Sequence, residues 1–106
     1  PSNSSAASDV YKRQTMIRLN VFVRVNETNR EKAIEAAKEL TACSLKEEGC
    51  IAYDTFESST RRDVFMICET WQNAEVLAAH EKTAHFAQYV GIIQELAEMK
   101  LEKFEF

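Results

Sequence analysis

Five residues in the second half of the chain have side chains suited to proton transfer or to binding a flat ring: Glu69, Trp71, His80, His85 and Phe86. A histidine is the side chain best able to accept or donate a proton near neutral pH. An aromatic wall with few polar groups is what a flat organic ligand requires, and further rings are available from Tyr53 and Phe65. The cluster therefore indicates a proton acceptor beside an aromatic ligand.

The spacing of these residues limits how they can meet. Glu69 and Trp71 lie on the same face of a strand, because side chains alternate along it. His80 and His85 are five residues apart, and on one continuous helix they would diverge by roughly 140°. A break near Thr83 would let the two histidines converge.

Structural roles for the same residues remain open. Trp71 and Phe86 suit a hydrophobic core, His85 a helix cap or the core, Glu69 a surface ion pair, and His80 a solvated helix face. A two-histidine, one-carboxylate metal site could be drawn from Glu69, His80 and His85. However, the spacing is not the four-residue spacing of a helical metal pair, and no second carboxylate is placed to orient both imidazoles. We therefore expect no metal.

Composition excludes several classes of function. The chain has 106 residues, enough for one domain, and a net charge of −4 with scattered basic residues, which argues against binding nucleic acid or an anionic membrane surface. It has no apolar run long enough to span a membrane. With only Gly49 and Gly91, it has no phosphate-binding glycine loop, and it lacks a haem-attachment motif, so we expect no cofactor.

The cysteines and the first residues bear on location and domain bounds. Cys43, Cys50 and Cys68 are odd in number and lack CxxC spacing, which favours reduced thiols in a reducing compartment and hence the cytoplasm. Residues 1–15 (PSNSSAASDVYKRQT) show no periodicity and are interpreted as a leader, with a short regulatory tail as the alternative. The domain is expected to span 16–106, beginning at Met16.

Hydrophobic periodicity predicts seven elements. Strands are expected over 17–25, 50–57, 63–71 and 101–106. A first helix should begin at the capping box of Thr28 and Glu31 and end at Gly49. Asn73 should cap a short helix ending at His80, and Thr83 a second one reaching about residue 99. The order β-α-β-β-α-α-β predicts an α+β, ferredoxin-like fold with an antiparallel sheet and its second helix broken in two.

The strand over 63–71 is apolar on both faces, with Val64, Met66 and Cys68 on one and Phe65 and Ile67 on the other. Such a strand is expected to be covered on both sides. One layer of helices covers only one side, and too few helices are predicted for two layers within one chain. We therefore expect a homodimer in which two sheets pack together.

Two segments resemble the antibiotic biosynthesis monooxygenase family. ETWQNAEVLAAHEKTAHF (69–86) resembles its signature, which is Glu-x-Trp, a short helix carrying a histidine, then a second histidine followed by an aromatic residue. LKEEGCIAYD (45–54) resembles the family's junction between the first helix and a strand with a tyrosine. The resemblance covers residues 16–106 and implies a dimeric α/β barrel.

The family resembles cofactor-free quinol and anthrone monooxygenases, so the resemblance implies oxidation of a small reduced aromatic molecule by O2. In this scheme His85 accepts the phenolic proton, Glu69 or His80 orients it, and Trp71 and Phe86 wall the pocket. The resemblance extends to haem-degrading oxygenases and to an isomerase of a phosphorylated sugar, which have a similar fold. These are alternative functions for the chain, and a non-catalytic dimer that binds a small molecule is a further one. The haem-degrading branch requires an inward asparagine where this chain has Val21.

Overall fold

The structure, a computed structural model, describes residues 15–106. The expected element order is confirmed: β1 (Ile17–Val25), α2 (Glu27–Ser44), β2 (Cys50–Glu57), β3 (Val64–Trp71), α3 (Ala74–His80), α4 (Ala84–Leu96) and β4 (Ala97–Glu105). The interpretation of residues 1–15 as a leader concerns residues that, apart from Thr15, lie outside the described part of the chain.

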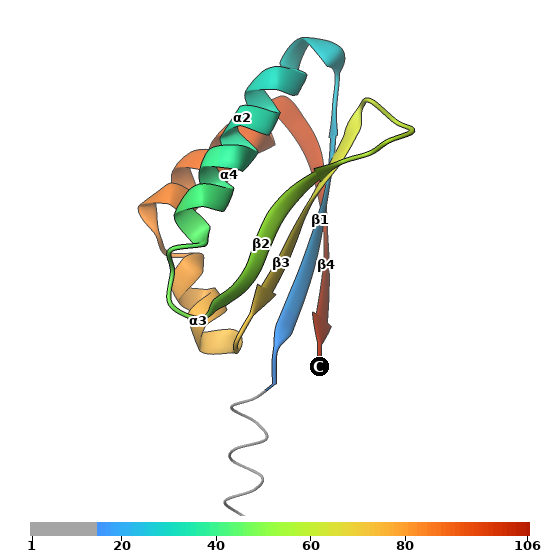
Figure 1. The fold of residues 1–106 in the computed structure, drawn as a ribbon. Helices are drawn as coiled ribbons and strands as arrows, with labels where there is room; N and C mark the ends of the chain where they lie inside the picture. Colours follow the sequence, from blue (N-terminus) through green and yellow to red (C-terminus); the bar gives the residue numbers. More distant parts are fainter. Residues whose placement is uncertain (1–14) are drawn as a thin grey trace, which may run out of the picture.

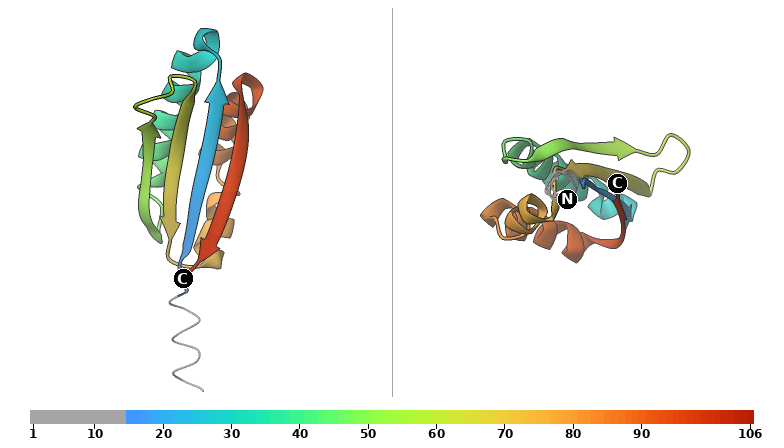
Figure 2. Two further views of the ribbon diagram at one scale, coloured as in Figure 1. Left: turned by 90° about the vertical axis from the view of Figure 1, so that its right-hand side faces the viewer. Right: turned by 90° about the horizontal axis from the view of Figure 1, so that it is seen from below.

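The four strands form one sheet in the order β2-β3-β1-β4, and every neighbouring pair is antiparallel. This is the predicted ferredoxin-like arrangement. All three helices lie on one side of the sheet (Figure 1). The other face is not covered by any described element, as the left panel of Figure 2 shows.

The hydrophobic core lies between the sheet and the helices. Strand β1 alternates as predicted, with its inward side chains buried: Ile17, Leu19, Val21, Val23 and Val25. Strand β3 buries Phe65, Ile67, Glu69 and Trp71 toward the same side. Because register and alternation agree across both strands, Glu69 and Trp71 share the helix-covered face, as the sequence indicated.

The first helix begins and ends earlier than predicted. Its N-cap is Asn26, not Thr28, and the Asn26 side chain accepts a hydrogen bond from the backbone N–H of Asn29 at 2.9 Å. An asparagine directly after a strand serves the cap as well as a threonine, so the helix starts as soon as β1 ends. The helix ends at Ser44, and Gly49 follows in the loop with φ +83°.

The predicted break between the last two helices is confirmed. Asn73 caps α3 by accepting from the N–H of Val76, and Thr83 caps α4 by accepting from the N–H of Phe86. Helix α4 ends at Leu96 rather than near residue 99, and β4 begins at Ala97 rather than Leu101. Pairing with β1 along its whole length explains the difference, since tertiary hydrogen bonding overrides a local helical pattern.

The uncovered face of the sheet is apolar at its centre. Phe22, Met66 and Phe56 lie side by side on β1, β3 and β2, and the two phenylalanines are 37% and 51% exposed. Strand β3 is therefore apolar on both faces, as predicted, but only one of them is buried within the chain. Cys43, Cys50 and Cys68 are unpaired and partly buried. Among the described helices, none is long and apolar enough to cross a membrane.

Candidate functional site

A cavity of about 280 Å³ lies between the inner face of the sheet and the helices. Its polar lining residues come from three elements and from the end of α3: Tyr53, Glu69, His80, Glu81 and Gln94. The remaining lining side chains are apolar: Leu19, Val21, Leu40, Ile67, Leu77, Phe86, Val90, Met99 and Leu101. The size is near the lower end for small-molecule sites, and a few polar groups in an apolar wall are typical of them.

One carboxylate oxygen holds both histidines beside this cavity. Glu47 Oε2 lies 2.6 Å from His80 Nδ1 and 2.7 Å from His85 Nε2. A carboxylate oxygen only accepts hydrogen bonds, so the ring nitrogen facing it on each histidine carries a hydrogen. In neutral His80 the hydrogen is therefore on Nδ1, and Nε2 carries a lone pair.

His80 Nε2 is buried and has no hydrogen-bond partner among the described residues. The ring is 1% exposed, and its position is fixed by aromatic neighbours. Trp71 lies against it with ring centroids 4.4 Å apart, and Phe86 meets it edge to face at 5.1 Å. His80 is also among the residues that line the cavity, so its ring is part of the wall around a molecule bound there.

The break between α3 and α4 brings the two histidines together. The Thr83 side chain accepts from the N–H of Phe86 and donates to the backbone oxygen of His80 at 2.8 Å, so it joins the end of one helix to the start of the next. Because the helix is interrupted there, both imidazoles contact Glu47 despite their unfavourable helical spacing. Local capping signals in the sequence thus produce a tertiary arrangement.

Glu69 is 5% exposed and accepts a hydrogen bond from Trp71 Nε1 at 2.9 Å. Burial raises the pKa of Glu69 to about 7, and the negative charges of Glu81 and Glu47 add to this effect. Hydrogen bonds from Trp71 and Tyr53 act in the opposite direction, but burial dominates. Burial, followed by the charge of Glu69, also raises the pKa of Tyr53. Near neutral pH the cavity therefore contains a carboxyl group that is easily protonated.

The residues predicted from the sequence divide into two groups. Glu69, His80, Phe86 and Tyr53 line the cavity. Trp71, His85 and Phe65 are not among its lining residues: Trp71 lies behind the His80 ring, His85 is on the far side of Glu47, and Phe65 is buried in the core. The carboxylate between the histidines is Glu47, which sequence reasoning did not select.

The expectation that no second carboxylate would orient both imidazoles is wrong, because Glu47 does so. Two imidazoles and a carboxylate are also donors that zinc or iron accepts, and the three atoms lie within 4.8 Å of one another. The oxygen-to-nitrogen distances of 2.6 and 2.7 Å are those of charge-assisted hydrogen bonds. Two ligands at tetrahedral positions around zinc would instead be about 3.3 Å apart.

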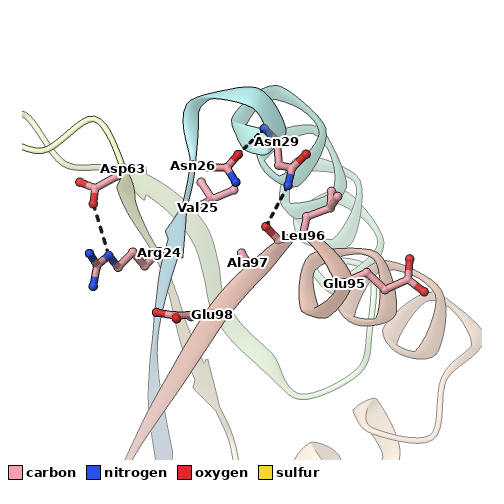
Figure 3. Close-up of a pocket in the computed structure, with 9 residues that line it drawn as sticks. All are labelled: Arg24, Val25, Asn26, Asn29, Asp63, Glu95, Leu96, Ala97 and Glu98. Atoms are coloured by element: carbon pink, nitrogen blue, oxygen red, sulfur yellow. Dashed lines mark hydrogen bonds and ion pairs between the residues drawn. The ribbon is translucent and has the colours of Figure 1, made fainter.

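A larger hollow of about 630 Å³ lies at the opposite end of the sheet, between β1, the start of α2 and the end of α4 (Figure 3). Its polar groups are largely paired with one another: Arg24 with Asp63 at 3.5 Å, and the Asn29 side chain with the backbone oxygen of Leu96. Its lining contains no histidine, cysteine or aromatic side chain. We therefore place the candidate site in the smaller cavity.

Comparison with known proteins agrees with this fold and indicates a family. Residues 16–91 match the family described as antibiotic biosynthesis monooxygenase. YcnE of Bacillus subtilis, a provisionally assigned monooxygenase, is 32% identical over 87 residues, which cover 82% of this chain and 92% of YcnE.

Two solved structures extend the comparison. A Bacteroides thetaiotaomicron protein of unknown function, described as a possible oxidoreductase, is 98% identical with a TM-score of 0.87, covering 88% of this chain and 99% of that one. A provisionally assigned antibiotic biosynthesis monooxygenase from Nitrosomonas europaea is 21% identical with a TM-score of 0.77, covering 86% and 88%. At that identity the likeness concerns the fold alone.

Proposed function

Since the chain belongs to the antibiotic biosynthesis monooxygenase family, we propose that it uses O2 to oxygenate a small reduced aromatic molecule, such as a quinol or an anthrone, without a cofactor. The observation that supports this is the buried, unpaired Nε2 of His80, a residue that lines a mainly apolar cavity. A buried imidazole with a free lone pair is suited to take a proton from a phenolic hydroxyl.

This proposal gives the role of base to His80 rather than His85. His85 is outside the cavity, and its Nε2 already donates to Glu47. Glu47 keeps the His80 proton on Nδ1 and compensates the positive charge when Nε2 accepts a second proton. His85 then acts as a positioning residue that holds Glu47 from the other side.

The reaction balances with O2 as the only oxidant. The substrate O–H bond breaks and the proton binds to His80 Nε2, leaving a phenolate that is easier to oxidise than the phenol. The phenolate gives one electron to O2, and the resulting radicals combine through a new carbon–oxygen bond. His80 returns its proton to the peroxide, and loss of water leaves one oxygen atom in the quinone product. The apolar cavity wall, including Phe86, excludes the water that would quench these intermediates.

The cavity is poorly suited to the alternative ligands. No lysine or arginine lines it among the described residues, whereas Glu69 and Glu81 do. A phosphorylated sugar or the propionates of haem would place anions next to these carboxyl groups without a compensating cation. Val21 lines the cavity where the haem-degrading branch requires an asparagine, and Asn20 is on the opposite face. A non-catalytic binding role would use the same cavity and is separated from catalysis only by an activity test.

We also propose that the protein acts as a homodimer through the open sheet face. The exposed row of Phe22, Met66 and Phe56 supports this, because contiguous apolar patches on a sheet usually mark an interface. The three unpaired thiols fit a reducing compartment, and we propose a cytoplasmic location.

The proposed activity is tested by oxygen consumption with a panel of substituted hydroquinones and dihydroxynaphthalenes. With ¹⁸O2, one labelled atom should enter the product and the other should appear in water. His80→Gln should lower the rate by about a hundred- to ten-thousand-fold, as expected for loss of a general base. His85→Gln should lower it much less.

Thermal unfolding of both variants checks that they fold. Unchanged oxygen uptake in folded His80→Gln would remove His80 as the base. No uptake with any member of the panel, together with binding of quinols, would favour the non-catalytic alternative.

A further inference from the structure

Glu69 also lines the cavity and is ionisable, but proton abstraction by His80 requires nothing of it. We propose that Glu69 selects the substrate: its protonated carboxyl donates a hydrogen bond to a carbonyl oxygen of the ligand while His80 Nε2 accepts one from a ligand hydroxyl. This inference rests on the proposed function, because it assumes that the substrate binds in the same cavity.

The Glu69 carboxyl accepts hydrogen bonds from Trp71 and Tyr53, and in its protonated form it also has a hydrogen to donate. Oε1 accepts from Trp71 Nε1 at 2.9 Å, and the same indole ring lies against His80. Trp71 thus holds the acid and the base in fixed relative positions from behind the cavity wall. Glu69 and His80 both line the cavity and are 5% and 1% exposed. A ligand that binds there therefore displaces little water from either group.

The charges around Glu69 favour its neutral form. The ionisable groups near it are Glu81 at the end of α3, Glu47 in the loop after α2, Tyr53 and Cys50 on β2, and His80, which lines the same cavity. No described lysine or arginine lines the cavity. Because burial and neighbouring carboxylates both oppose ionisation, the pKa of Glu69 is raised to about 7. A carboxyl kept neutral near physiological pH can act as a hydrogen-bond donor.

The pair of groups defines a ligand class. A hydroxyl satisfies the unpaired His80 nitrogen, and a carbonyl accepts from Glu69, so a neutral hydroxylated aromatic ketone or quinone uses both. A simple phenol leaves the acid without an acceptor, and buried polar groups left unpaired reduce affinity. A carboxylated ring adds a negative charge beside Glu81, with no described lysine or arginine in the cavity lining to compensate it, and is disfavoured.

Binding of ligands that O2 does not oxidise separates this inference from the proposed reaction. We would titrate the full-length protein anaerobically with 3- and 4-hydroxyacetophenone, which carry a hydroxyl and a carbonyl. The matched controls are 4-ethylphenol, which lacks the carbonyl, 4-methoxyacetophenone, which lacks the hydroxyl donor, and 4-hydroxybenzoate, which is an anion. Calorimetry or tryptophan fluorescence gives the dissociation constants.

Below about pH 6 at least one hydroxyketone should bind about tenfold more tightly than 4-ethylphenol, and 4-hydroxybenzoate should bind more weakly than both. The advantage over 4-ethylphenol should disappear as pH rises through about 7, because ionised Glu69 no longer donates. The two ligands share the hydroxyl and differ in the carbonyl, so the comparison isolates the contribution of the carbonyl. Glu69→Gln, whose amide still donates, should keep the preference at every pH, and Glu69→Leu should lose it.

Equal affinities for the hydroxyketones and 4-ethylphenol below about pH 6 would overturn the inference. So would a preference for the hydroxyketones that depends on pH in Glu69→Gln as it does in the wild type. Quinol oxygenation without a carbonyl preference would overturn it and leave the proposed function in place. Carbonyl-dependent binding without oxygen uptake would support the role of Glu69 and contradict the proposed oxygenation.

Discussion

Glu47 Oε2 lies 2.6 Å from Nδ1 of His80, although 33 positions separate the two residues in the chain. The contact determines which face of the imidazole is basic, because the carboxylate keeps the hydrogen on Nδ1 and leaves the lone pair on Nε2. His80 lines the cavity, so this uncommitted nitrogen belongs to the candidate site.

We predict that Glu47→Gln lowers the rate of oxygenation by about ten- to a hundredfold, since a neutral amide neither fixes the tautomer nor compensates the imidazolium as well. Proton–nitrogen NMR of the imidazoles should show His80 protonated on Nδ1 in the wild type and a mixture of tautomers in the variant. Glu48→Gln is the matched control, because Glu48 is adjacent in sequence and exposed. A rate unchanged in Glu47→Gln would show that the contact is only structural.

Gly49 allows the loop carrying Glu47 to approach α3. Its φ is +83°, and a β-carbon added there would lie 2.5 Å from Val76 Cγ1. Gly49→Ala should therefore lower the free energy of unfolding by about 1–3 kcal/mol, measured in urea. Gly91→Ala is the control: it meets nothing within 4 Å inside α4 and should stabilise by about 0.5–1 kcal/mol. Equal effects of the two substitutions would contradict this role for Gly49.

The raised pKa of Glu69 predicts a dependence of stability on pH. The folded protein holds the Glu69 proton up to about pH 7, whereas the unfolded chain releases it near 4.5. Stability from this group is therefore fully present below pH 4.5 and is lost as pH rises to about 7, by at most on the order of 3 kcal/mol. Urea unfolding at several pH values should show this slope in the wild type relative to Glu69→Gln. If both proteins respond to pH alike, Glu69 does not carry the shift.

The strands and the site residues were predictable to different degrees. Alternation predicted β1 to the residue, because that strand has one clearly apolar face. The bounds of β2 were predicted from its many β-forming residues, since only Tyr53 is buried along that strand. The end of α4 was not predictable from local pattern, since Ala97 leaves the helix to pair with Val25 on β1. The break between α3 and α4 was predictable, because Asn73 and Thr83 are local capping signals.

Glu47 could not be identified from the sequence, for a different reason. It is in a loop among other charged residues, and nothing in its spacing relates it to His80 or His85. Only packing of the loop against α3, which depends on Gly49 and Val76, brings the carboxylate to the histidines. The residues that line the cavity also depend on tertiary packing. Alternation along the strand predicted Glu69 and Trp71 on one face, but of these two only Glu69 lines the cavity.

The open sheet face predicts dimerisation. At micromolar concentration, sedimentation velocity should give the mass of a dimer, and Phe22→Glu should dissociate it by placing a charge in the centre of the apolar row. Ile92→Glu is the control, because Ile92 is also 37% exposed but lies on α4, on the other side of the sheet. A wild-type monomer, or equal dissociation in both variants, would contradict an interface at this face.

The cluster of Glu47, His80 and His85 also allows a decisive test for metal. We predict that the purified protein is colourless and contains far less than one zinc or iron per chain. The hydrogens that each imidazole shares with Glu47 occupy the positions a metal would need, and the atoms would have to separate by about 0.6 Å to accommodate one. Elemental analysis of protein prepared without metal-affinity steps measures the content, and a haem titration should produce no Soret shift. Stoichiometric metal that is lost in His85→Ala but kept in Glu48→Gln would show instead that the cluster is a metal centre, and His80 would then have to be reassigned from base to ligand.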